Sequence, residues 1–135
     1  MPTPVIPAPP PLPGALDPPW PGVALCEPDA SLRMLLSEWL QRAKLEPLPC
    51  DAAETGARVV LVIADVQAPR RDGAARIARL RQRFPGAKVL AISAQFMPAM
   101  CGATAAAVEL GADAVLAKPF AVKLFVDAVR ALTGL

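Results

Sequence analysis

Histidine is absent from this chain of 135 residues, and its three cysteines show no CxxC spacing. A zinc site of the usual kind therefore has no set of ligands here. We expect Cys26, Cys50 and Cys101 to be reduced core thiols, as is usual in a reducing compartment. The alternative is a bridge between Cys26 and Cys50, because these two residues would end adjacent strands.

Signatures of nucleotide binding and of export are missing as well. The sequence contains neither a P-loop nor a GxGxxG motif, so nucleotide binding has no support. No basic segment precedes an apolar one at the N-terminus, which excludes a secretory signal. The one uncharged stretch of membrane length, 89–108, changes midway from strand-like to helix-like periodicity. It predicts a buried strand and a helix rather than a membrane span, and we expect a cytoplasmic protein without membrane association.

Proline is concentrated near the N-terminus, where ten of the 17 prolines fall within residues 1–22. Proline lacks an amide donor and restricts φ, so this segment cannot form a helix or a central strand. We predict a disordered arm over 1–22, either a passive leader or a ligand for a proline-recognising partner. Residues 23–135 are enough for one domain with its own core.

The net charge of +2 is too small to indicate a nucleic-acid partner by itself. Seven basic residues do lie between Arg70 and Lys88, most of them on the segment 72–84, whose apolar face contains Ile77 and Leu80. No aromatic residues alternate with the arginines, so a solvated helix face explains this cluster better than direct nucleic-acid binding.

Short apolar runs alternate along the chain with segments of helical periodicity. This pattern predicts an α/β fold, a doubly wound five-stranded parallel sheet of order 2-1-3-4-5. Two prolines place the second strand at the edge of the sheet. Only 51–58 separates the second strand from the third, so the second helix is expected to be short or missing. The predicted strands are 23–25, 45–50, 59–63, 88–92 and 113–116.

The predicted helices have recognisable ends. Asp29 or Ser31 caps the first helix, and Asp72 caps the helix that follows the third strand. The next helix begins near Pro98 and is terminated by Gly111. The buried stripe of the first helix is predicted to consist of Leu32, Leu35, Leu36, Trp39 and Leu40.

Polar residues follow four of the predicted strands, namely Glu27, Asp65, Ser93 and Lys118. The carboxyl ends of parallel strands open onto one crevice, so these side chains should become neighbours. A carboxylate can attack phosphorus and form an acyl phosphate if the charge on the other oxygens is neutralised. Asp65 is therefore the candidate nucleophile, with the hydroxyl of Ser93, the ammonium of Lys118 and a Mg²⁺ ion binding the phosphoryl group.

Three motifs carry a resemblance to a known family. The segment 65–73, DVQAPRRDG, resembles the phosphoacceptor loop of the receiver domains of bacterial response regulators, the CheY-like family. Ser93-Ala94 and Lys118-Pro119-Phe120 resemble two further family motifs, and 111–114 resembles the approach to the last strand. The resemblance covers nearly all of 23–135 and implies a flavodoxin/CheY-like fold.

The resemblance also implies roles for single residues. Asp65 would be phosphorylated by a histidine kinase or phosphotransfer protein, and Ser93 and Lys118 would hold the phosphoryl group. The Lys118-Pro119 peptide is expected to be cis, as it often is in the family. Val115 stands where the family often has a switching aromatic residue, so the usual relay to the last helix would be weakened or rerouted.

The metal site implied by the resemblance is divergent. Its ligands would be the carboxylates of Glu27 and Asp65 and the backbone carbonyl of Gln67, with Asp29 as a further candidate. Pro28 occupies the position of the second acid, which normally contacts the metal directly. The sequence thus leaves two alternatives, a working Mg²⁺ site and a site that has lost useful affinity for Mg²⁺.

Our leading hypothesis is a stand-alone receiver, since nothing follows Leu135, that is phosphorylated on Asp65 and signals by binding an output protein. It would not be an enzyme, and a homodimer through its last helix is a further option. The alternative is a pseudo-receiver that acts as a constitutive docking module. A phosphatase of the haloacid-dehalogenase type would need an acid at Gln67, and DNA binding through the arginine-rich helix is a fourth reading.

Overall fold

The structure, a computed structural model, describes residues 20–51, 58–97 and 100–135. Most of the predicted arm and most of the short second crossover lie outside these residues. The strands are β1 (Gly22–Cys26), β2 (Glu46–Pro49), β3 (Val59–Asp65), β4 (Lys88–Ser93), β5 (Cys101–Gly102) and β6 (Ala114–Ala117). The helices are α1 (Ala30–Arg42), α2 (Ala74–Arg83), α3 (Ala105–Leu110) and α4 (Val122–Thr133), and a π-helical turn η2 (Pro69–Gly73) precedes α2.

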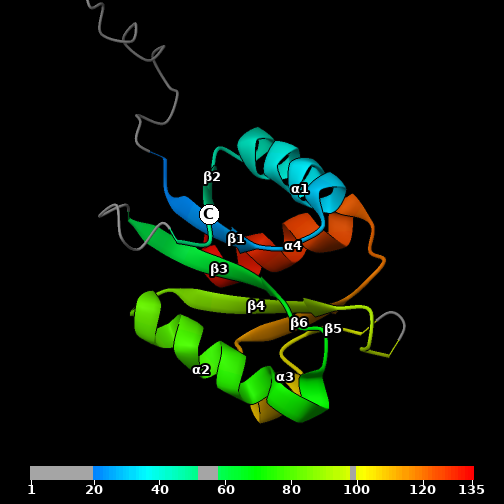
Figure 1. The fold of residues 1–135 in the computed structure, drawn as a ribbon. Helices are drawn as coiled ribbons and strands as arrows, with labels where there is room; N and C mark the ends of the chain where they lie inside the picture. Colours follow the sequence, from blue (N-terminus) through cyan, green and yellow to red (C-terminus); the bar gives the residue numbers. More distant parts are fainter. Residues whose placement is uncertain (1–19, 52–57, 98–99) are drawn as a thin grey trace, which may run out of the picture.

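The described strands form one sheet of order β2-β1-β3-β4-β6-β5. Helices α1 and α4 cover one face, and α2 and α3 cover the other (Figure 1). The first five strands of this order are parallel neighbours, which confirms the predicted doubly wound sheet and its order. Among the described strands, β2, which contains Pro47 and Pro49, pairs only with β1, so the predicted edge position is confirmed.

Within the part of the chain that the structure describes, the sheet has one strand more than predicted. Residues 101–102 form β5, which pairs antiparallel with Val115 and Leu116 of β6. The prediction of a helix beginning near Pro98 was therefore wrong, although Pro98 itself lies outside the described residues. Helix α3 begins only at Ala105, with Thr104 as its N-cap. The backbone of 101–102 bonds to the sheet edge, and Gly102 has a φ of +94°, which no right-handed helix accepts.

Each face of the sheet has its own apolar layer. Ile77 and Leu80 pack under α2, and Leu36, Leu40 and Phe125 pack under α1 and α4. The predicted stripe of α1 needs one correction, because Leu35 is 42% exposed. The buried pair Leu36 and Leu40 is spaced by four residues, and this spacing turns the preceding residue away from the sheet.

The predicted cap of the helix after β3 was also wrong. Helix α2 begins after Gly73, and no side chain of the described residues caps its N-terminus. Asp72 lies instead within η2, where its amide donates to the carbonyl of Ala68. The π-helical turn continues directly into α2, so its own hydrogen bonds replace a capping side chain.

Cys26 and Cys50 form a disulfide, so the prediction of reduced thiols was wrong for this pair. The register of the two strands explains the bond, because Leu25 is paired with Pro49 and the residue that follows each of them along the chain is the cysteine. The two Cα atoms lie 4.8 Å apart, within the range that a disulfide spans. Cys101 is a free thiol, but it is exposed rather than part of the core.

The stretch 89–108 is not a single helix. Its described residues form most of the buried strand β4, a connection, β5 and the start of α3. Among the helices in the described residues, none has the length and apolar character needed to cross a bilayer.

Candidate functional site

The carboxyl ends of β1, β3, β4 and β6 meet at one edge of the sheet. Glu27, Asp65, Ser93 and Lys118, which the sequence predicted as neighbours, line a common cavity there of about 380 Å³. The carboxylates and the hydroxyl belong to residues that are almost fully buried, at 4%, 7% and 0% exposure for Glu27, Asp65 and Ser93. The topology of the sheet therefore brings together residues that are up to 91 positions apart, counted from Glu27 to Lys118.

Lys118 bridges the two buried acids. Its ammonium nitrogen lies 2.7 Å from Oδ1 of Asp65 and 2.7 Å from Oε1 of Glu27. Burial by itself would lower the pKa of Lys118, but the hydrogen bonds to Asp65 and Glu27 and their negative charges outweigh burial and raise the pKa above its ordinary value. The lysine is therefore held in its charged form, with Asp65 as one of its two partners.

Glu27 is fixed from the other side by the start of α1. Its second oxygen, Oε2, accepts a hydrogen bond of 3.0 Å from the amide of Asp29. The carboxylate of Asp29 is exposed, and its Oδ1 caps α1 by accepting from the amides of Ser31 and Leu32. Arg33 donates to the main-chain carbonyl of Glu27 at 2.7 Å. Both carboxylate oxygens of Glu27 are thus engaged with groups of the protein itself.

Ser93 offers a hydroxyl proton to the cavity. Its Oγ accepts a hydrogen bond of 3.0 Å from the amide of Gln95. A hydroxyl that accepts one bond still has a proton to donate, so Ser93 can donate to an anion beside Asp65. The main chain ties this strand end to the next one, because the amide of Lys118 donates to the carbonyl of Ser93 at 3.0 Å. The Lys118-Pro119 peptide that follows is cis, as predicted.

Arg76 is a positioning residue that the sequence reasoning missed, since it was assigned to a solvated helix face. Its Nε donates to the main-chain carbonyl of Asp65 at 2.9 Å, and a second nitrogen lies 3.5 Å from the carbonyl of Cys26. It thereby joins the ends of β3 and β1 from α2. The sequence did contain one signal for this position. Arg76 lies four positions before the buried Leu80, and residues four apart share one face of a helix, here the face toward the sheet.

The oxygens around the cavity fit a magnesium ion that takes most of its ligands from water and a phosphoryl group. Among the described residues, no hydrogen bond reaches Oδ2 of Asp65, and Gln67 lines the same cavity. Pro28 adds no side-chain oxygen, and within the described part of the chain no three acidic, histidine or cysteine side chains form a ligand cluster. Magnesium needs only one or two carboxylates when phosphate and water supply the rest.

Known proteins share this architecture. The family model of the response regulator receiver domain matches residues 23–130. The response regulator protein FleR of Pseudomonas aeruginosa is 35% identical over 116 residues, in a match that covers 79% of this chain and 23% of that protein. The chain therefore spans about a quarter of the length of this relative.

Solved structures of similar fold come from several bacteria. A response regulator from Thermotoga maritima superposes with a TM-score of 0.69 at 19% identity, covering 86% of this chain and 99% of that chain. A response regulator receiver protein from Burkholderia phymatum has a TM-score of 0.64 at 25% identity, covering 85% of this chain and 96% of that chain.

Proposed function

Because this chain belongs to the receiver domain family of response regulators, whose members act in two-component signalling, we propose that Asp65 is its phosphoacceptor. The observation that supports this proposal is the position of Asp65, a buried carboxylate paired with Lys118 beside the hydroxyl of Ser93. The phosphoryl donor would be a histidine kinase or a phosphotransfer protein, and the phosphorylated domain would signal by binding an output protein.

The proposed reaction uses the free oxygen of Asp65. Oδ2 forms a bond to phosphorus, and the bond from phosphorus to the leaving group breaks, with the leaving group keeping the electron pair. Lys118 then exchanges part of its contact with Asp65 for one phosphoryl oxygen, and the hydroxyl of Ser93 donates to another. The chain acts on itself in this step, which is the behaviour of a signalling module rather than of an enzyme with a separate substrate.

Magnesium, when bound, would neutralise charge on the phosphoryl oxygens. Asp65 and the main-chain carbonyl of Gln67 would hold it. Glu27 would join them only after releasing Lys118, and Asp29 only with the oxygen that is not capping α1. Pro28 makes this set smaller than one with two adjacent acids, so we expect a high magnesium concentration to be needed.

Intact mass after incubation with acetyl phosphate tests the proposal, with and without Mg²⁺. We expect the mass of one phosphoryl group on the native chain and none on Asp65→Asn. Asp72→Asn is the matched control, since Asp72 is an exposed acid of the following turn. An adduct that persists in Asp65→Asn, or no adduct in the native chain at any magnesium concentration, would overturn the assignment.

A second candidate is a pseudo-receiver that docks its partner without phosphorylation. The observation that favours it is the engagement of both Glu27 oxygens, one by Lys118 and one by the amide of Asp29, next to a proline. If the protein is a pseudo-receiver, we expect no phosphoryl adduct at any magnesium concentration. We also expect Asp65→Asn to leave the binding of the output protein unchanged.

A further inference from the structure

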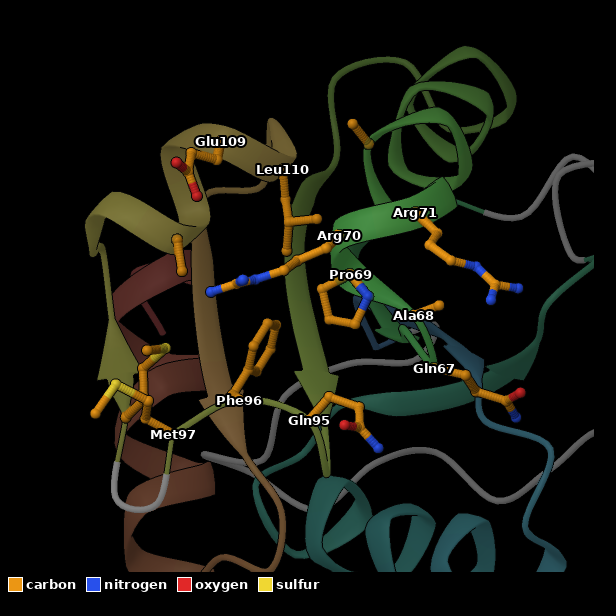
Figure 2. Close-up of a pocket in the computed structure, with 13 residues that line it drawn as sticks. Gln67, Ala68, Pro69, Arg70, Arg71, Gln95, Phe96, Met97, Glu109 and Leu110 are labelled. Atoms are coloured by element: carbon orange, nitrogen blue, oxygen red, sulfur yellow. The ribbon is translucent and has the colours of Figure 1, made fainter.

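A second and larger cavity lies beside the first. It is an open groove of about 900 Å³, with the loop that follows β3 on one side and residues 95–97, Met100 and helix α3 on the other (Figure 2). The two cavities share Gln67 and Gln95 as lining residues. The groove falls in the size range of ligand-binding sites, and the phosphoacceptor chemistry proposed above does not use its other walls.

The floor of the groove is mainly apolar. The ring of Phe96 forms part of this surface, and Leu110 and Pro69 lie next to it (Figure 2). Met97 is 71% exposed, and Met100 is half-buried. Phe96 and Leu110 themselves are buried, at 8% and 5% exposure, so the accessible apolar surface of the groove comes mainly from Met97 and Met100. Methionine side chains adapt to the shape of an apolar partner and are enriched in protein-binding surfaces.

Two charged side chains of opposite sign stand over this apolar surface. Arg70 extends from η2 into the groove, and Glu109 projects from α3 on the opposite side (Figure 2). Within the described residues neither side chain has an ion-pair or hydrogen-bond partner. Arg71 also lines the groove but points away from it in the same view. The groove thus has one positive wall and one negative wall, both available to a partner.

We propose that this groove docks an amphipathic helical peptide of a partner protein. The apolar face of the peptide would lie on Met97 and Met100, beside the buried ring of Phe96. An acidic side chain would pair with Arg70, and a basic one on the other flank would pair with Glu109. An arginine held over an apolar floor is a frequent anchor in interfaces, because its contact with a carboxylate is partly shielded from water. The helix-in-groove mode of recognition has these features.

This inference rests on the groove alone and not on phosphorylation of Asp65. Its test begins with selection from a random dodecapeptide display library on the immobilised native chain. We expect the selected peptides to combine leucine, phenylalanine or methionine with an acid on one flank and a base on the other. The strongest peptide, labelled with fluorescein, then serves as the probe for fluorescence anisotropy.

Charge variants test on which side of the groove the acidic side chain of the peptide binds. Arg70→Glu should weaken binding of the probe about tenfold or more, because it places like charges together. Arg79→Glu is the matched control, since Arg79 is exposed on α2 and does not line the groove, and it should stay within about twofold. Replacing the paired acid of the probe by lysine should restore binding to Arg70→Glu, and Glu109→Lys should weaken the original probe.

Three results would overturn the inference. One is the absence of any peptide above background on the native chain. Another is a selected set without acidic residues beside its apolar ones. The last is equal weakening by Arg70→Glu and Arg79→Glu, which would indicate a general charge effect on the probe. Arg70→Met removes the charge and keeps an apolar stem, so it controls for the possibility that Arg70→Glu acts by disturbing η2. It should also weaken binding of the probe.

Discussion

The ammonium of Lys118 lies 2.7 Å from Oδ1 of Asp65, although 53 positions separate the two residues in the chain. The same nitrogen contacts Oε1 of Glu27, so a single positive charge is shared by two buried carboxylates. The three residues come from the ends of three different strands. Their contact joins the proposed phosphoacceptor to the two neighbouring strand ends and should contribute to the stability of the sheet edge.

Removal of the lysine should therefore destabilise the fold. Lys118→Met leaves Glu27 and Asp65 buried without their shared partner, and we expect a loss of about 2 kcal/mol in the free energy of unfolding at pH 7. Urea denaturation followed by tryptophan fluorescence measures this loss. Lys123→Met is the control, because Lys123 pairs with Asp127 on the exposed face of α4 and should change stability by less than about 0.5 kcal/mol. Equal effects of the two variants would contradict the prediction.

The pH dependence of the Lys118 contribution follows from its raised pKa. A group whose pKa is higher in the folded state stabilises fully below its ordinary pKa, here 10.5, and the contribution is lost as the pH rises through the folded value. The stability difference between the native chain and Lys118→Met should stay constant from neutral to mildly alkaline pH. Above pH 10.5 the difference in the free energy of unfolding, measured by urea denaturation, should shrink. An increase of this difference above pH 10.5 would contradict the raised pKa of Lys118.

Asp113 should contribute stability that is lost in acid. Burial would raise the pKa of Asp113, but hydrogen bonds from the amide of Val89 and from Arg81, with the arginine charge, lower it below its ordinary value of 3.8. Such a group stabilises fully above its ordinary pKa, and its contribution disappears as the pH falls through the lower folded value. Asp113→Asn should cost about 1 kcal/mol at pH 7.

Urea denaturation across pH values measures this loss. The difference between native chain and Asp113→Asn should narrow below pH 3.8. Asp127→Asn, at an exposed helical ion pair, is the matched control and should have a small effect at every pH. A cost of Asp113→Asn that is the same at pH 7 and in strong acid would show that charge is not its cause.

The Cys26–Cys50 disulfide should stabilise the edge of the sheet. It closes a loop with a sequence separation of 24, and a disulfide over such a loop contributes about 3 kcal/mol, because it restricts the unfolded chain. Cys50→Ser should lower the free energy of unfolding by about this amount, whereas Cys101→Ser, at an exposed free thiol, should change it little. Thiol titration of the denatured, unreduced chain should find only Cys101 reactive, and reaction of all three cysteines would contradict the bond.

Gly22 should not accept a side chain. A Cβ at this position would lie 2.6 Å from the main-chain oxygen of Arg58 and 2.5 Å from Cδ1 of Leu48. The leucine can move, but the carbonyl of Arg58 accepts a hydrogen bond from the amide of Gly22 and is held in place. Gly22→Ala should therefore destabilise the protein by about 2 kcal/mol, measured as a lower midpoint of urea unfolding. An unchanged midpoint would show that β1 can shift at this point.

The site residues were within reach of sequence reasoning because each follows an apolar run. The runs at 59–63 and 88–92 are mainly apolar, as expected for buried strands, and parallel order then brings Asp65 and Ser93, which come after these runs, to one edge. The edge position of β2 could be predicted for a similar reason, since proline cannot donate to a second neighbour. In these cases local chemistry restricts the fold.

The features that escaped prediction depend on contacts between distant segments. Residues 101–102 become a strand because the edge of β6 offers them hydrogen bonds, which their own sequence does not show. Arg76 reaches the carbonyl of Asp65 only because α2 packs beneath β3. The bond between Cys26 and Cys50 follows from the register of two strands, and a shift by one residue would separate the sulfur atoms.

The sequence by itself therefore determined the order of the strands and the set of polar residues at their ends, because both follow from hydrophobic periodicity and parallel topology. Only the tertiary structure decided which of those residues touch. Lys118 pairs with both Glu27 and Asp65, and Arg70 stands over the apolar floor of a groove, because side-chain contacts depend on distances that no spacing in the sequence encodes.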